Sequence, residues 1–104
     1  SEQATNQQSV DSHVKLNGKD GFIDKTGKQV IPCVYDYAFS FSEGLAGVAL
    51  NDKVGFIDKT GKQVVPCVYD DVRYFSAFDI IVAIVGESEE NQVRYYYDRD
   101  GNSL

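Results

Sequence analysis

The chain has 104 residues, of which 42% are hydrophobic and 25% charged, and this fits one folded domain with a modest core rather than a two-domain enzyme. Its net charge of −6 argues against nucleic acid and anionic membrane as partners, because phosphate groups are bound by basic surfaces. The longest apolar run, residues 80–85, has the length of a strand, which excludes a membrane pump and any membrane insertion.

The first 12 residues are polar and lack the basic and apolar regions of a signal peptide, so we expect a disordered lead-in. After it, the segment GFIDKTGKQVIPCVYD at 21–36 recurs at 55–70 with one change, Ile31 to Val65. The period is 34 residues, and a similar segment precedes each copy, at 14–20 and at 48–54. A period of this size indicates a repeat architecture, in which a unit buries its apolar face against its neighbours.

A divergent third unit follows the two clear copies. Residues 80–84 align with 46–50, and residues 96–101 align with 56–61 at an offset of 40, which predicts six inserted residues around 86–92. We therefore expect about three units, at 13–46, 47–79 and 80–104, in a single domain at 13–104.

Each unit is predicted to form three short strands, which in the second unit are residues 45–50, 55–58 and 63–65. Asn17 and Gly18 predict a tight turn between the first two strands, and Pro66 is expected to end the third, since proline cannot donate to a central ladder. No long segment has helical spacing, although residues 70–78 are compatible with a short helical turn. The predicted fold class is all-β, built from tandem antiparallel hairpin or meander repeats.

The segment DKTGK occurs at 24–28 and at 58–62. Its first four residues also open the phosphorylation signature of P-type pumps, but such enzymes need an α/β domain and metal-binding carboxylates, and this sequence has no α/β pattern. A type I turn favours Asp at its first position and Gly at the left-handed position that follows. We interpret three segments as structural turns, with the residue pairs Asp24 and Gly27, Asp58 and Gly61, and Asp98 and Gly101.

Several motifs together resemble the WG-containing repeat, also called the KWG repeat, over residues 14–104. They are Gly-Phe-Ile-Asp-Lys-Thr-Gly-Lys, Val-Ile-Pro or Val-Val-Pro, Tyr-Asp, and Phe-Ser-Glu-Gly-Leu-Ala. The resemblance implies a bacterial β-rich repeat module of the kind suspected of binding or scaffolding. The Trp that the family places before the glycine is replaced by Asp20 and Val54. The compartment stays open, and an exported bacterial protein whose signal is removed from this chain fits the resemblance.

Residues with metal-binding or catalytic chemistry are few. Cys33, Cys67 and His13 cannot complete a zinc site without carboxylates or a partner chain, and His13 forms no convincing catalytic dyad. The cysteines are either half-buried thiols or a disulfide, which needs Cα atoms within about 7 Å. The calcium-like segment at 98–102 lacks a Glu at its twelfth position. We predict no cofactor, no metal site and no enzyme activity.

The aromatic residues, seven Tyr and six Phe, are the strongest candidates for function, although most are expected to fill the core. We hypothesise that Tyr37, Tyr74 and Tyr96 line a groove for a protein, peptide or glycan. The leading hypothesis is thus a non-catalytic binding or scaffolding module, and the alternative is a structural spacer in a larger surface or envelope protein. Free edge strands additionally predict self-association.

Overall fold

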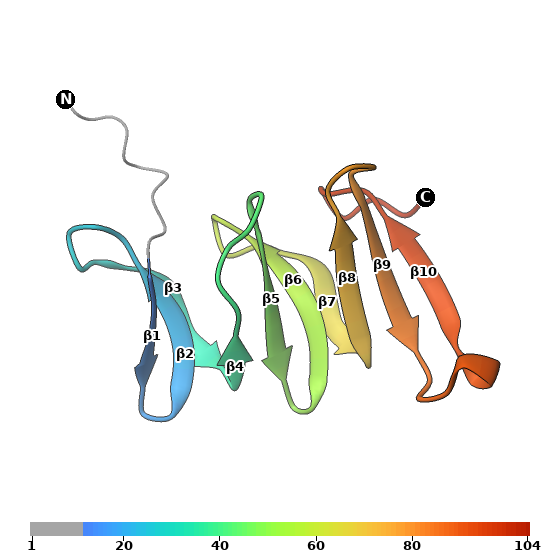
Figure 1. Ribbon diagram of the computed structural model, residues 1–104. Helices are drawn as coiled ribbons and strands as arrows, with labels where there is room; N and C mark the ends of the chain where they lie inside the picture. Colours follow the sequence, from blue (N-terminus) through green and yellow to red (C-terminus); the bar gives the residue numbers. More distant parts are fainter. Residues whose placement is uncertain (1–11) are drawn as a thin grey trace.

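A computed structural model describes residues 12–104, which form an all-β repeat, as the sequence predicts (Figure 1). No α-helix occurs in this part of the chain. The predicted disordered lead-in lies outside the described residues except for Ser12, which begins the first strand. The elements are β1 (Ser12–Leu16), β2 (Lys19–Ile23), β3 (Gln29–Tyr35), β4 (Tyr37–Ala38), β5 (Leu45–Leu50), β6 (Lys53–Asp58), β7 (Gln63–Tyr69), β8 (Asp71–Phe75), β9 (Ile80–Val85), the 3-10 helix η2 (Glu89–Asn91) and β10 (Val93–Tyr97).

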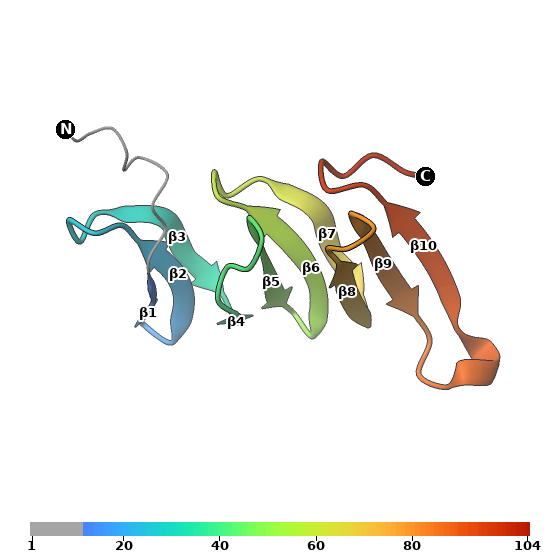
Figure 2. The same ribbon diagram turned by 45° about the horizontal axis from the view of Figure 1, so that its top comes forward.

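The strands form three antiparallel sheets that follow one another along the chain. The first sheet has the strand order β1-β2-β3, the second β4-β5-β6-β7 and the third β10-β9-β8. Figures 1 and 2 show the sheets side by side in a row. The chain passes from one sheet to the next at Asp36 and Asp70, roughly ten residues before the unit boundaries expected at 46 and 79. Because the sequence repeats every 34 residues, the difference concerns only the residue at which a unit is taken to begin.

The third strand of a unit does not end at its proline, so the prediction for Pro66 is wrong. β7 continues through Pro66 to Tyr69. The register changes on the way, because Phe56 pairs with Val65 whereas Val54 pairs with Tyr69. The strand therefore bulges around the proline, which is one of the places in a sheet where proline is accepted. β3 follows the same course.

The third unit is shifted by one residue from its predicted alignment. Tyr37 pairs with Ala49 in the second sheet and Asp71 pairs with Ile84 in the third, so β9 is offset from β5 by 35 residues. The alignment of 80–84 with 46–50 is therefore wrong, and a slip of one residue exchanges the two faces of a strand. One extra residue lies before β9, and five of the six lie in the loop between β9 and β10. Residues 71–75, for which the sequence allowed a helical turn, form β8.

Apolar side chains are buried between consecutive sheets. The first junction, between the first and second sheets, buries Phe22 and Ile57, and the second junction, between the second and third sheets, buries Phe56 and Ile81. β6 contributes to both junctions because neighbouring side chains on a strand point to opposite faces. Each sheet thus has a forward face toward the next sheet and a back face toward the preceding one, as expected for a stacked repeat.

Asp36 and Asp70 join neighbouring sheets, a role that sequence analysis did not assign. The Asp70 N–H donates to Ile84 O at 2.9 Å, and Asp70 Oδ2 accepts from the Gly86 N–H at 2.8 Å in the third sheet. Asp70 Oδ1 lies 2.6 Å from Lys53 Nζ in the second sheet. The recurrence of Tyr-Asp in both copies was the available signal. Equivalent bonds connect Asp36 with Ala49, Asn51 and Lys19.

The DKTGK segments form turns in which the aspartate bonds the backbone that follows it. Asp58 Oδ1 accepts from the Thr60 N–H at 2.9 Å and from the Lys62 N–H at 3.1 Å, and Gly61 has a φ of +90°. Asp24 and Asp98 make the same backbone bonds two and four residues ahead. Backbone geometry therefore accounts for the spacing of Asp and Gly.

Replacing the turn glycine should cost more stability than replacing the turn aspartate. Gly61→Val should lower the free energy of unfolding by about 2 kcal/mol, since a β-branched residue is strained at positive φ. Asp58→Asn should cost less than about 1 kcal/mol, because the amide oxygen can accept the same bonds. Urea unfolding followed by circular dichroism measures both, and equal losses would contradict this account of the turn.

Candidate functional site

A groove of about 330 Å³ opens between the second and third sheets. Residues of β5 and β6 line one side of it, and β8 and the segment at 39–43 line the others. Apolar side chains predominate, and we call this site the junction groove. It is lined by Phe39, Ser40, Ser42, Glu43, Leu45, Gly47, Val48, Val54, Phe56, Asp71, Val72, Arg73, Tyr74 and Ser76.

Two aromatic side chains, those of His13 and Phe41, lie against Phe22 in the corresponding part of the first junction. His13 pairs with Phe22 in the first sheet, whereas Gly47 pairs with Phe56 in the second. Phe41 packs edge-on against Phe22, with ring centroids 4.7 Å apart. Gly47 brings no side chain to the second junction, so space remains there.

The two junctions also differ in the residue that precedes the repeated glycine at positions 21 and 55, which is Asp20 in the first sheet and Val54 in the second. Asp20 is 2% exposed, its Oδ2 accepts from the Ala38 N–H at 3.0 Å, and its Oδ1 lies 2.8 Å from Lys15 Nζ. The bond with Lys15 lowers the pKa of Asp20, so this buried group is a carboxylate at neutral pH. Val54 holds the same position in the second sheet and lines the junction groove with a small apolar side chain.

Polar contacts fix the side of the junction groove that carries Tyr74. The Tyr74 hydroxyl donates to Asp79 Oδ1 at 2.7 Å, and this bond raises the pKa of Tyr74. The Arg99 guanidinium lies 5.9 Å from the centroid of the Tyr74 ring and donates to the carbonyl oxygen of Glu43. Arg99, which follows β10, thus connects the two walls of the groove.

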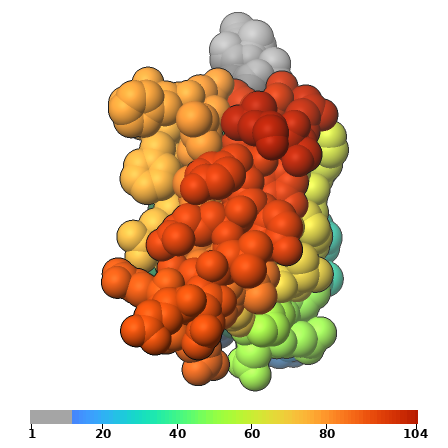
Figure 3. Space-filling model, turned by 90° about the vertical axis from the view of Figure 1, so that its right-hand side faces the viewer, coloured from blue at the N-terminus to red at the C-terminus, as the bar shows by residue number. Residues whose placement is uncertain are grey.

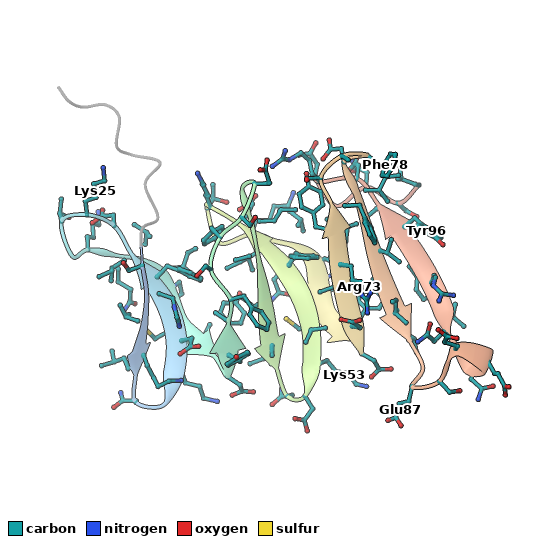
Figure 4. All side chains as sticks on the ribbon, in the orientation of Figure 1. Lys25, Lys53, Arg73, Phe78, Glu87 and Tyr96 are labelled. Carbon is teal, nitrogen blue, oxygen red and sulfur yellow. The ribbon has the colours of Figure 1, made fainter. Side chains whose placement is uncertain are left out.

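A second hollow of about 320 Å³ lies on the forward face of the third sheet, which we call the end hollow. Figure 3 views the molecule from this end of the row, and Figure 4 labels Arg73 and Tyr96. Val82 pairs with Tyr96 as Gly47 pairs with Phe56, so Tyr96 is the counterpart of Phe56. Tyr96 is 44% exposed and Phe56 8%, because the structure describes no sheet beyond the third. The lining residues are Asp71, Arg73, Phe75, Val82, Ile84, Glu89, Gln92, Arg94 and Tyr96.

The three tyrosines singled out in the sequence lie at separate places. Tyr74 lines the junction groove and Tyr96 lines the end hollow, with β8 contributing to both. Tyr37 is 53% exposed, and its ring centroid is 4.9 Å from that of Phe39, which lines the junction groove. Sequence reasoning missed Gly47 and Val54, and the missing Trp before Gly55 was the signal that could have pointed to them. Binding roles for the three tyrosines stay predictions.

The groups with chemical reactivity form no cluster in the described part of the chain. Cys33 and Cys67 are free thiols on different sheets, and burial raises the pKa of Cys67. No group of three or more metal-ligating side chains occurs in residues 12–104. The Tyr69 hydroxyl bonds that of Tyr97, and burial raises the pKa of Tyr69 to about 12, so it stays protonated at neutral pH. Within the same residues, no helix has the length and apolar character needed to cross a membrane.

Comparison with protein families finds two adjacent matches to the WG containing repeat, at residues 21–53 and 55–81. The matches begin at Gly21 and Gly55, which lie opposite the proline bulges of β3 and β7. No curated protein and no solved structure gives a significant match. Since the two segments cover more than half of the chain and each contains the repeated strands, the chain belongs to the WG-containing repeat family.

Proposed function

We propose that this protein is a non-catalytic β-repeat module that binds a peptide segment of a partner protein in the junction groove. The observation that most supports this proposal is the position of Val54. This residue lines the groove and stands directly before Gly55, where the repeat is named for a tryptophan. A valine there, with Gly47 beside it, leaves room for an apolar side chain supplied by a partner.

The lining of the groove supports a peptide ligand more than a glycan. Phe39, Leu45 and Phe56 offer apolar surface, and burial of one large apolar side chain contributes roughly 1.5–3 kcal/mol. The Tyr74 hydroxyl, which would suit a sugar, is already bonded to Asp79. The favoured partner is therefore a segment with an exposed aromatic or large aliphatic residue.

A structural spacer is the second candidate, and the row of stacked sheets in Figure 1 favours it. Each sheet buries side chains against the next, which produces a rod that can separate other parts of a larger protein. Self-association through the free edge of β8 stays a prediction under either proposal.

The proposal is tested with the short peptide acetyl-Ala-Phe-Ala-amide and its leucine and tryptophan analogues. In ¹H–¹⁵N spectra of the full chain, at least one peptide should shift the amides of Gly47 and Val72. Val54→Trp should abolish these shifts, because the indole fills the groove from within. Val68→Trp is the matched control, since Val68 lies on β7, is 57% exposed and is not part of the groove lining.

Two results would contradict peptide binding in the groove. In one, the shifts persist in Val54→Trp while the variant keeps the wild-type fold by circular dichroism. In the other, none of the peptides shifts the groove amides of the wild-type chain, and the structural spacer is then the favoured function.

A further inference from the structure

The first junction shows how a polar group is held beside a free strand edge. The Phe39 N–H donates to Gly47 O at 2.9 Å within the second sheet. Because antiparallel pairing alternates along a strand, the neighbouring amide of Ala38 points away from β5. It donates instead to Asp20 Oδ2 of the first sheet, at 3.0 Å. A side-chain oxygen from the preceding sheet thus satisfies an amide on the edge of β4.

At the second junction, the corresponding amide has lost this acceptor. β8 pairs with β9 as β4 pairs with β5, so Val72 is the counterpart of Ala38 and its N–H points away from β9. Val54 holds in β6 the place that Asp20 holds in β2. A valine side chain accepts no hydrogen bond. Since Val54 and Val72 both line the junction groove, the Val72 amide is open to a ligand.

We propose that the junction groove binds, beside an apolar side chain, a carbonyl or carboxylate oxygen of the peptide that accepts a hydrogen bond from the Val72 N–H. The inference rests on the proposed function and specifies its ligand. The ligand oxygen takes the place of the Asp20 carboxylate at the first junction. An amide covered by a ligand without an acceptor costs free energy, so a ligand that supplies an oxygen is favoured over a purely apolar one.

The charges around the groove do not by themselves choose between a neutral and an anionic oxygen. Arg73 brings one positive charge, and Glu43 and Asp71 bring two negative charges. Arg73 Nε donates to Asp71 Oδ2 at 3.1 Å, which neutralises part of this set. The source of the oxygen is therefore an outcome of the experiment.

Three peptides distinguish the sources: acetyl-Gly-Phe-Ala-Gly-amide and the versions with Asn or Asp in place of Ala. Hydrogen exchange of the Val72 amide should slow when any of them is bound. If a side chain supplies the oxygen, the Asn or Asp peptide should bind about three- to tenfold more tightly than the Ala peptide. Equal affinities with a protected Val72 amide would assign the backbone carbonyl, and both results support the inference.

The variant Ala49→Lys/Val54→Asp copies the pair of Lys15 and Asp20 into the second sheet. The new carboxylate should protect the Val72 amide in the free protein and prevent peptide binding. Ala49→Lys/Val54→Ala is the matched control, because it adds the same lysine without an acceptor. It should still bind peptide and leave Val72 unprotected.

The inference is overturned, with peptide binding intact, if peptides bind while exchange at Val72 stays unchanged. It is also overturned if Ala49→Lys/Val54→Asp binds the peptides as tightly as the control Ala49→Lys/Val54→Ala does. A measurement on the free wild-type chain needs no variant: the Val72 amide should exchange faster than the Ala38 amide, and equal protection would mean that Val72 already has an acceptor. If no peptide of this series or of the first series binds, the proposed function fails and the inference fails with it.

Discussion

Gly55→Ala should lower the free energy of unfolding by about 3 kcal/mol or more, which is large for the addition of one methyl group. A Cβ atom at this position would lie 2.2 Å from Val65 O and 2.7 Å from the carbonyl carbon of Pro66. These are backbone atoms of the bulge in β7, so they cannot rotate away as a side chain can. The alanine has to displace β7 from β6, and with it one side of the second junction.

Urea unfolding monitored by circular dichroism measures this loss, and Gly47→Ala is the matched control. Gly47 lies on the adjacent strand β5, and the nearest atom to its added Cβ would be Phe39 Cδ2 at 3.3 Å, on an exposed side chain that can move. The control should stay within about 1 kcal/mol of the wild type. Equal stabilities for the two variants would show that the close approach of β7 to Gly55 does not constrain the fold.

The third sheet shows that the bulge at Pro66 requires a glycine at position 55, whereas the hairpin of β5 and β6 does not. Tyr95 pairs with Ala83 as Gly55 pairs with Val48, so a tyrosine takes the place of the glycine there. In the described residues no bulged strand crosses Tyr95, and next to β10 the chain forms a single bridge between Tyr97 and Ser103. With no strand folded over this position, a large side chain is accepted.

Local features of the fold could be predicted from the sequence because the residues that determine them are close together. The repeat period follows from self-comparison, and the turn at Asp58 and Gly61 involves bonds over no more than four residues. The turn at Asn17 and Gly18 is similar, since both residues have positive φ and are types that tolerate it. Such signals fix the all-β class and the strand order within a unit.

Features that depend on how sheets stack could not be predicted. Asp20 is a charged residue in a polar segment, yet it is buried because Ala38, in the next sheet, supplies a donor for its carboxylate. The junction groove needs Gly47, Val54 and β8 to come together across two sheets. The shift of β9 by one residue has the same origin, because its register is set by pairing with β8 and by packing on the second sheet.

The folded chain should lose stability as the pH falls below 3.8, the ordinary pKa of an aspartate side chain. A pKa that is lowered in the folded state means that folding favours the carboxylate form. The resulting stabilisation is fully present above the unfolded value of 3.8 and is lost as the pH falls through the folded values. The pKa is lowered for Asp20, Asp24, Asp36, Asp58, Asp70 and Asp98.

Two of the three aspartates that bond between sheets, Asp20 and Asp70, should account for a measurable part of this pH dependence. Bonds from Lys15 and from the Gly86 N–H lower the pKa of Asp20 and of Asp70, respectively. Asp20→Asn/Asp70→Asn should therefore flatten the fall of unfolding free energy below pH 3.8, because two groups no longer titrate. Asp100→Asn is the control, since this exposed carboxylate accepts no hydrogen bond from the described residues. If the double variant and the control give the same slope in urea unfolding across this range, the acid sensitivity does not arise at the connections between sheets.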